Sequence, residues 1–388
     1  MRAIPASVGS PAPARPGATL RGAPCAREGL PEVPARRVCH AHRVSRSRRT
    51  GILLVNLGTP AAPEPAAVRR YLAEFLGDPR VLDMPALARW LLLRAVILPF
   101  RPRRSAEAYQ KIWGPEGSPL LVHGRALQEA LAKALGDDFC VELGMRYGEP
   151  SIAEAFGRLE ASDVARIVAL PLFPQYASSS GGSAAEAVLR LAATRVSVPA
   201  MTVLGEFFDD PGFLGAWEAV AAPELAAFGP DHVLFSYHGL PERHVRRSDP
   251  GGRHCLVSDR CCDAIGPANR RCYRAQCFAT TRALAARLGL RTEEHSTAFQ
   301  SRLGRTPWIR PFTDEALPAL AARGVRRLAV VCPSFVADCL ETLEEIGLRA
   351  RDQWAGLGGE ELLLVPSLNA HPVWVAALER MLRGYGRS

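Results

Sequence analysis

Five cysteines lie within 23 residues of this 388-residue chain: Cys255, Cys261, Cys262, Cys272 and Cys277. The other five cysteines are scattered along the sequence. Disulfides do not persist in a reducing compartment, and five clustered free thiols would be an oxidation hazard. Four thiolates suit either a [2Fe–2S] cluster or a tetrahedral zinc ion. We therefore expect four of the five to bind such a group and one, Cys261 or Cys262, to be spare.

His238 is a candidate catalytic residue in the second half of the chain. It stands in the sequence FSYHGLP (residues 235–241), where a predicted strand passes into a Gly/Pro turn. Imidazole groups take up a proton or bind a metal near neutral pH. A single histidine at a strand end is more often a hydrogen-bonded structural residue. Taken alone, this residue leaves both interpretations open.

A row of acidic residues follows another predicted strand, at Asp338, Glu341 and Glu345. A helix that begins near Asp338 would place all three on one face. Such a row could carry protons or pass a divalent cation inward. Alternatively, Asp338 and Glu341 would form a capping box, because acidic residues suit a helix N-terminus.

Arg146 and Tyr147 follow a third predicted strand, and Tyr176 follows a fourth. An arginine beside a tyrosine could bind a carboxylate and stack on a flat ring. The alternative is that these are ordinary residues at the rim of a site.

Short apolar runs alternate with longer helical patterns, which indicates parallel βα units and an α/β fold. Ligands of open α/β sheets bind at the carboxyl ends of the strands, where the candidate residues lie. The motif G-x-G-x-x-G is absent, so no dinucleotide site is expected. We predict four strands in each half, with a boundary near residues 208–214. The predicted strands are residues 51–57, 140–145, 166–170, 200–204, 232–237, 293–299, 327–332 and 361–365.

The first 49 residues differ in composition from the rest of the chain. Residues 1–50 contain ten arginines and two glutamates, a net charge of +8 out of the +9 of the whole chain. The remainder carries about +1, so no nucleic-acid partner is expected. We predict a disordered basic leader over 1–49, which resembles either a transit peptide or the product of an upstream start codon. Domains are predicted over 50–210 and 211–369, with a cysteine-rich insertion over 255–277.

The segment 87–100 (LARWLLLRAVILPF) is apolar apart from two arginines. It is too short to span a bilayer, which takes about 20 residues. It is either a buried helix or an amphipathic segment that contacts a membrane surface. No secretory signal or membrane-spanning segment is evident, so we expect a cytoplasmic protein. If the segment contacts a membrane, the protein would be peripheral on the inner membrane.

Eight motifs in order resemble those of the ferrochelatase family. Each is modest alone, but their order is specific, and they cover nearly all of the chain after the leader. The motifs are GILLVNLGTP, YQKIWGPEGSPL, GMRYGEP, LFPQYASSSGGS, LFSYHGLPERH, WIRPFTDE, ADCLETLEE and PSLNAHP, between residues 51 and 372.

The resemblance implies two similar Rossmann-like domains, each with a four-stranded parallel sheet, and a last helix (370–388) that packs back on the first domain. It implies a lyase of haem biosynthesis that inserts the substrate Fe²⁺ into protoporphyrin IX to form protohaem. Alternatives are a chelatase for another tetrapyrrole, such as coproporphyrin or a cobalt substrate, and a non-enzymatic haem or iron–sulfur carrier.

The resemblance also assigns roles to the candidate residues. His238 and Glu341 fall on the opposed residues of the metal site, and Glu345 on the next acid of the row. Four further residues fall on positions that line the porphyrin or the metal entrance: Leu57, Arg146, Tyr147 and Tyr176. Cys339 stands where some members carry histidine, which puts its part in metal passage in doubt. Cluster-bearing members favour [2Fe–2S] over zinc in the insertion.

Overall fold

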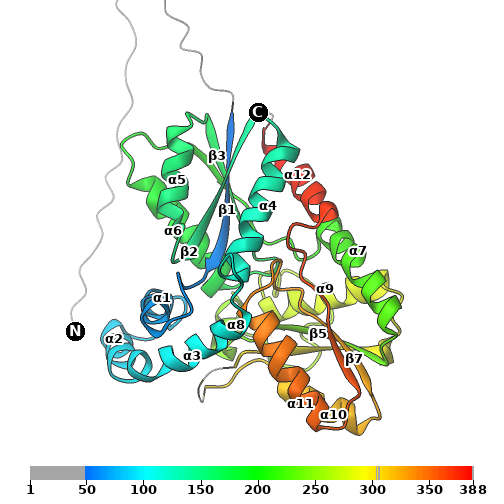
Figure 1. The fold of residues 1–388 in the computed structure, drawn as a ribbon. Coiled ribbons are helices and arrows are strands. Elements are labelled where there is room, and N and C mark those ends of the chain that lie inside the picture. The colour runs from blue at the N-terminus through cyan, green and yellow to red at the C-terminus, as the bar shows by residue number, and fades with distance from the viewer. Residues whose placement is uncertain (1–48, 303, 305, 387–388) are drawn as a thin grey trace, which may run out of the picture. The chain divides into compact units, whose positions relative to one another are not determined.

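The buried apolar runs of the sequence form two four-stranded parallel sheets (Figure 1). The strand order is β2-β1-β3-β4 in the first sheet and β6-β5-β7-β8 in the second, so the two halves repeat one topology. This computed structural model describes residues 49–302, 304 and 306–386. The predicted leader lies outside the described residues, apart from Arg49.

The predicted α/β fold is confirmed, and all eight predicted strands are present. Strand β6 begins two residues later than predicted, because residues 292–294 form a short 3₁₀ turn instead. The strands are β1 (Thr50–Gly58), β2 (Phe139–Tyr147), β3 (Arg166–Pro171), β4 (Ala200–Val203), β5 (His232–His238), β6 (His295–Gln300), β7 (Arg327–Val331) and β8 (Glu361–Leu364).

Helices cover both faces of the first sheet, as the continuous apolar strands require. Ile52 of β1 belongs to a buried cluster with α4 (Pro119–Leu135), and its neighbour Leu53 to a cluster with α5 (Ile152–Ala161) and α6 (Ser183–Ala193). The alternation follows from the pleat of the strand. Full burial of side chains of this size stabilises the fold by about 1.5–3 kcal/mol each.

The second sheet has the same two-sided cover. One face packs on α7 (Pro211–Phe228) and α9 (Tyr273–Arg287), and the other on α10 (Thr313–Ala322) and α11 (Arg351–Gly356). Helix α12 (Pro372–Gly386) packs against α4 and α7, with the ring of Trp374 5.8 Å from that of Phe207. Residues 46–388 form one unit, so the predicted domain boundary near residue 210 stays a prediction.

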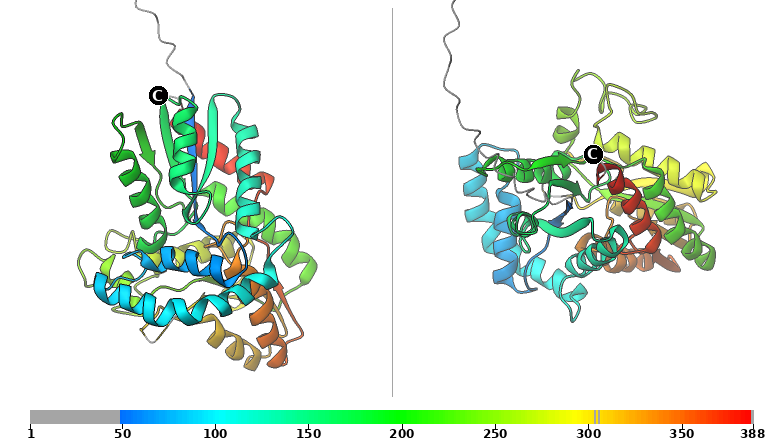
Figure 2. Two further views of the ribbon diagram at one scale, coloured as in Figure 1. Left: turned by 60° about the vertical axis from the view of Figure 1, so that its left-hand side comes forward. Right: turned by 90° about the horizontal axis from the view of Figure 1, so that it is seen from above.

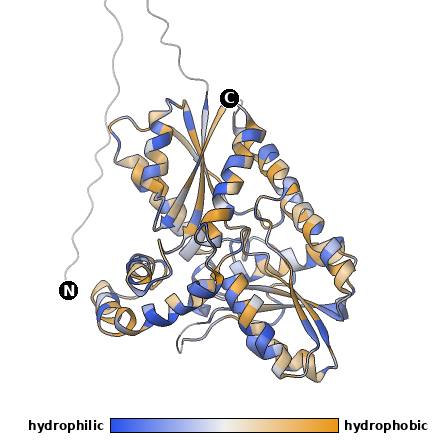
Figure 3. Cartoon of the chain, viewed as in Figure 1, coloured by the Kyte–Doolittle hydropathy of each residue, from blue (hydrophilic) through white to orange (hydrophobic). Residues whose placement is uncertain are grey.

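Residues 86–104, which we call the lip segment, are helical and partly exposed, with Leu93 and Leu98 buried. They form α2 (Ala86–Leu91), the π-helix η1 (Leu92–Ile97) and the start of α3 (Leu98–Ile112). Helix α3 runs beside α1 (Pro65–Gly77) (Figure 2). Leu87, Trp90 and Phe100 are 70%, 56% and 75% exposed, so the buried-helix alternative is wrong. Leu87 and Trp90 are thus exposed apolar residues of α2, and the ribbon at this end of the molecule is coloured largely as hydrophobic in Figure 3.

The cysteine-rich insertion joins α8 (Glu242–Arg247) to α9 without a regular element over residues 248–272. The carboxylate of Asp249 organises its start by accepting hydrogen bonds from four backbone N–H groups, of residues 251, 252, 254 and 255. Helix α9 begins at Tyr273, inside the span predicted for the insertion. Cys272 is its N-cap residue, and Cys277 lies on the helix rather than in the insertion loop.

Candidate functional site

His238 is the last residue of β5 and is half-buried. Its backbone N–H donates to the hydroxyl of Ser334 at 3.2 Å, and its carbonyl accepts from the hydroxyl of Tyr273 at 2.8 Å. Its Nδ1 lies 2.6 Å from the carbonyl oxygen of Gly239, so Nδ1 carries the proton and Nε2 is left to accept one. The imidazole ring centre is 6.3 Å from that of Phe335.

Gln300, at the end of β6, connects His238 with Glu341. Its backbone carbonyl accepts from the N–H of Gly239 at 2.7 Å, beside His238. Its side-chain amide donates to the backbone carbonyl of Glu341 at 2.7 Å. Gln300 therefore links the turn that follows His238 to the backbone of Glu341.

Glu341 opens the π-helix η4 (Glu341–Ala350). Its charge lies near the buried hydroxyls of Tyr71 and Tyr109, whose pKa values are raised well above the usual range, first by burial. Leu57 and Leu340, which precedes Glu341, both pack against the buried cluster that contains these tyrosines.

The predicted row of three acids is wrong at its first member. Asp338 precedes the helix, and its buried carboxylate accepts from the Thr342 hydroxyl at 3.1 Å and the Asn369 amide at 2.8 Å. It is engaged by these donors and is not paired with Glu341 in a capping box. Glu345 remains in the row and accepts from the backbone N–H of Ser301 at 2.9 Å.

Arg146 and Tyr147 meet at one buried carboxylate, that of Asp78. Arg146 Nη2 donates to Asp78 at 2.7 Å, the Tyr147 hydroxyl at 2.8 Å and the Ser183 hydroxyl at 2.5 Å. Burial opposes ionisation of Asp78, but the hydrogen bonds from Ser183, the Arg80 amide and Tyr147 hold its pKa below the usual range. The Arg146 guanidinium also lies over the Tyr147 ring, 4.5 Å from its centre.

Tyr147 is 0% exposed, so its side chain does not line an open site. It supports Arg146, which is only partly buried and keeps part of its guanidinium accessible. Tyr176 is half-buried after β3, and the guanidinium of Arg271 from the insertion lies 5.6 Å from its ring centre. Its hydroxyl approaches the turn at Gly182, which also contacts Arg80.

All five cysteines of the insertion are buried and belong to the main hydrophobic core. Cys261 Sγ lies 3.7 Å from Cys262 Sγ, and Cys272 is in side-chain contact with both Cys255 and Cys262. Cys277 instead contacts the side chain of Tyr273. These contacts therefore join four cysteines. Cys261 and Cys262, one of which was expected to be spare, are both among the four.

The donor chemistry of these thiols fits a [2Fe–2S] cluster or zinc, because four soft sulfur ligands lie in one buried cluster. Arg274 Nη1 lies 3.1 Å from Cys262 Sγ and adds positive charge beside them. Within the described part of the chain, however, no three His, Cys, Asp or Glu side chains are arranged so that they could already hold a metal ion.

The lip segment is anchored through Asp83, just before α2. Its carboxylate accepts from Arg243 Nε at 2.6 Å and Arg247 Nη1 at 3.1 Å, and lies 3.2 Å from His244 Nε2. These three residues belong to α8, which follows the His238 turn. The anchor therefore joins the lip segment to the element next to the site.

We expect Asp83→Asn to lower the free energy of unfolding by about 1.5–3 kcal/mol near pH 7, the usual size for a charge-assisted hydrogen bond. Burial by itself would raise the pKa of Asp83. The hydrogen bonds from Arg243 and His244 outweigh this effect and lower the pKa to about 2. The carboxylate therefore stabilises the fold above about pH 4, the unfolded pKa of Asp, and this contribution is lost as the pH falls toward 2.

Urea unfolding of the wild-type protein and of Asp83→Asn between pH 7 and pH 3 measures this effect. The difference between their free energies of unfolding should become smaller as the pH falls. Asp263→Asn is the control, because Asp263 forms an exposed ion pair with Arg260 that contributes little. An Asp83 variant that behaved like this control would contradict the anchor.

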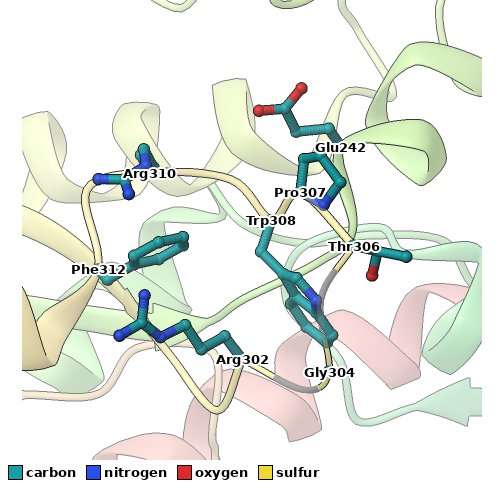
Figure 4. Close-up of a pocket in the computed structure, with 8 residues that line it drawn as sticks. All are labelled: Glu242, Arg302, Gly304, Thr306, Pro307, Trp308, Arg310 and Phe312. Carbon is teal, nitrogen blue, oxygen red and sulfur yellow. The ribbon is translucent and has the colours of Figure 1, made fainter.

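A cavity of about 480 Å³ lies beside the turn that follows His238 (Figure 4). Trp308 on its wall forms a β-bridge with Pro241 of that turn. Arg302 and Arg310 lie over the ring of Phe312, at 4.4 and 4.3 Å from its centre. None of the predicted site residues lines it; the lining residues are Glu242, Arg302, Gly304, Thr306, Pro307, Trp308, Arg310 and Phe312.

Three residues that organise the site were missed in the sequence: Asp78, Gln300 and Tyr273. Gln300 directly follows a predicted strand, which was the only available signal, and nothing in the sequence marked Asp78 or Tyr273. Together the arrangement offers a proton-accepting imidazole, a carboxylate nearby, and an arginine and a tyrosine at the edge of the adjacent sheet. This chemistry suits proton exchange and divalent-cation transfer at a flat, negatively charged ligand.

Comparisons with known proteins agree with this chemistry. The family model described as Ferrochelatase matches residues 49–384. A ferrochelatase of Coxiella burnetii (strain RSA 493 / Nine Mile phase I) is 51% identical over 340 residues, 88% of this chain and 95% of that protein. A ferrochelatase of Legionella pneumophila (strain Lens) is 46% identical over 334 residues, 86% and 98% respectively.

Among solved structures, the sirohydrochlorin chelatase SirB from Bacillus subtilis subspecies spizizenii, in complex with cobalt, matches with a TM-score of 0.44. It is 12% identical, and the match covers 87% of this chain and 95% of that one.

Proposed function

Because this chain belongs to the ferrochelatase family, we propose that it inserts Fe²⁺ into protoporphyrin IX to form protohaem. The observation that carries this proposal is the joint placement of His238 and Glu341 around Gln300. The reaction exchanges two pyrrole N–H protons for one Fe²⁺, so it needs a proton acceptor and a route for a cation. It involves no electron transfer.

His238 is proposed as the acceptor of the pyrrole protons, on one face of the ring. Its Nδ1 is turned to the Gly239 carbonyl, which leaves Nε2 for this role. Glu341 is proposed on the opposite face, and Glu345 continues the path for protons or metal toward solvent. A planar porphyrin shields its nitrogens, so binding contacts remote from the reacting centre must offset the cost of puckering it.

The porphyrin is proposed to contact Leu57, Arg146 and Tyr176. Leu57 and Arg146 are the next-to-last residues of β1 and β2, and Tyr176 follows β3, so all three lie at the carboxyl ends of parallel strands at one edge of the sheet. Arg146 is the candidate for a porphyrin carboxylate, because Tyr147 and Asp78 hold its guanidinium in place. Tyr147 contributes through Arg146 and not by direct contact.

The test is an anaerobic assay with protoporphyrin IX and Fe²⁺ that follows loss of porphyrin fluorescence and growth of haem absorption. Catalytic turnover supports the proposal. Turnover only with coproporphyrin, or only with Co²⁺, would show that the protein acts on that substrate instead. Tight porphyrin binding without turnover of any pair would point to a carrier.

We also propose that four of the five insertion cysteines hold a [2Fe–2S] cluster. When bound, it would contribute structure at the start of α9, since Cys272 and Cys277 flank its first turn. The support is the burial of all five thiols together and the side-chain contacts among four of them.

Anaerobically purified protein should show a visible absorption band and equal amounts of bound iron and sulfide. Zinc without sulfide would replace the cluster with a tetrahedral zinc site. Single Cys→Ser variants should each lose the group, except for the spare cysteine. Cys140→Ser is the control, because Cys140 lies on β2, outside the insertion. An unchanged spectrum in all five variants would overturn the proposal.

The exposed lip segment is proposed to contact an anionic membrane surface. Leu87, Trp90 and Phe100 offer apolar area, and three exposed arginines, Arg94, Arg103 and Arg104, can meet acidic head groups. None of the described helices has both the length and the apolar character needed to cross a membrane. The proposed location is therefore cytoplasmic, on the surface of the inner membrane.

Sedimentation with phosphatidylglycerol vesicles tests this contact. We expect Leu87→Ser with Phe100→Ser to lower the bound fraction several-fold, because two exposed apolar side chains are lost. Val196→Ser is the control, since Val196 is fully exposed elsewhere, after α6. Equal binding of all three proteins would rule out the lip segment as the contact.

A further inference from the structure

The first turn of α9 contacts both groups of proposed site residues. It begins directly after Cys272 and reaches Cys277, so two cysteines of the insertion flank it. Between them, Tyr273 reaches the carboxyl end of β5, and Gln276 reaches the segment after β3. A single helical turn thus spans the two sheets at their functional edges.

Tyr273 fixes the peptide group of His238. Its hydroxyl donates to the His238 carbonyl at 2.8 Å, while the His238 N–H is held by Ser334 at 3.2 Å. The backbone of the proposed base is therefore bound on both sides by side chains. Tyr273 is itself buried, so its hydroxyl has no water to replace this partner. The orientation of the imidazole depends on that peptide, since Nδ1 is bonded to the next carbonyl.

Gln276 fixes Tyr176 in the same way on the other sheet. Its Oε1 accepts from the backbone N–H of Tyr176 at 2.6 Å, and its Nε2 donates to the Arg270 carbonyl at 2.8 Å. The side chain is 0% exposed. Arg271, next to Arg270, lies over the ring of Tyr176. The insertion thus contacts the proposed porphyrin-binding tyrosine through its backbone and through its ring.

We infer that Tyr273 and Gln276 are positioning residues of the reaction, Tyr273 for proton transfer at His238 and Gln276 for porphyrin binding at Tyr176. This inference rests on the proposed function of the site. It also gives the cysteine-rich insertion a physical connection to both proposed walls of the porphyrin site. The connection consists of hydrogen bonds within the polypeptide and does not depend on which metal group the cysteines hold.

The first test is Tyr273→Phe, which removes one hydroxyl and keeps the ring. We expect kcat to fall about tenfold, while the Kd for protoporphyrin stays within twofold, since the lost interaction acts on the proton acceptor. Tyr237→Phe is the matched control. Tyr237 is equally buried and precedes His238 in the chain, but its hydroxyl bonds Thr281 and not the His238 peptide.

The second test is Gln276→Leu, which leaves the Tyr176 N–H buried without an acceptor. We expect the Kd for protoporphyrin, measured by fluorescence quenching, to rise about tenfold, while kcat at saturating porphyrin stays within threefold. Gln128→Leu is the control, because its amide bonds the Val141 carbonyl in the middle of β2, away from the site. Thermal unfolding and bound iron are measured for every variant to show that fold and insertion are intact.

Tyr273→Phe is expected to change mainly kcat, and Gln276→Leu mainly the Kd for protoporphyrin. This difference distinguishes positioning residues from residues with a general structural role. If both variants changed kcat and Kd alike, or behaved like their controls with only a lower Tm, the inference would be overturned. Failure of the proposed function is separable, because the wild-type protein would then make no haem at all. In that case the Kd comparison for Gln276→Leu still tests the connection to Tyr176.

Discussion

His238→Ala should reduce kcat for haem formation by a factor of 10² to 10⁴, the usual contribution of a positioned acid–base group. The Kd for protoporphyrin should stay within about threefold, because the contacts proposed to bind the ring come from the other sheet. The distinction follows from geometry: His238 ends β5, whereas Leu57, Arg146 and Tyr176 follow or end strands of the first sheet. Stopped assays and fluorescence quenching on one preparation measure both quantities.

His295→Ala is the matched control for this experiment. His295 is also half-buried and belongs to the same sheet, but it begins β6, at the opposite end from the site. Its ring packs 6.0 Å from that of Phe235, so the variant loses packing and no proposed proton acceptor. Near-normal turnover in His238→Ala would show that the base lies elsewhere.

The second large effect is expected for Asp78→Ala, which removes the carboxylate shared by Arg146, Tyr147 and Ser183. Removing one partner of a buried ion pair costs about 3–5 kcal/mol, because the other charge is left unpaired. Since Arg146 is partly exposed, we expect the lower end of that range. Porphyrin affinity should fall in parallel, as the guanidinium loses its support.

A double-mutant cycle with Arg146→Ala tests this explanation. Without the arginine, Asp78→Ala no longer strands a charge, so the double variant should be more stable than the sum of the single effects predicts, by at least 1 kcal/mol. The pKa of Asp78 lies below its usual range, so its contribution is present above about pH 4 and lost in stronger acid. Additive effects across the cycle would mean that the two side chains do not act through each other.

The strands could be predicted because each is a short apolar run that the chain breaks with Gly, Pro or a polar residue. The position of His238 at the end of a strand follows from the same pattern. The helix at Glu341 was misplaced by a few residues because Asp338 finds partners in Asn369, thirty-one residues further along. Local patterns do not encode such a contact.

Asp78 and Tyr273, which position the site residues, could not be predicted because their partners are also distant in the sequence. Asp78 lies 68 residues from Arg146, and Tyr273 lies 35 from His238. Before the fold is known, a buried aspartate after a helix and a tyrosine between two cysteines carry no sign of these partners. The lip segment differs: its apolar residues were evident, but sequence alone does not show whether another element covers them.

The docking of α12 between α4 and α7 has a consequence for how the protein is made. Helix α4 belongs to the first half of the chain, yet part of its apolar face is covered by a helix that is synthesised more than 230 residues later. Until α12 has been made, that part of α4 stays uncovered, and chains that stall before it would expose apolar surface to chaperones and proteases. Trp374 is fully buried against Phe207 and Phe213, so its burial marks chains in which α12 has docked. Its fluorescence could report, during translation, the moment at which α12 packs against α4 and α7.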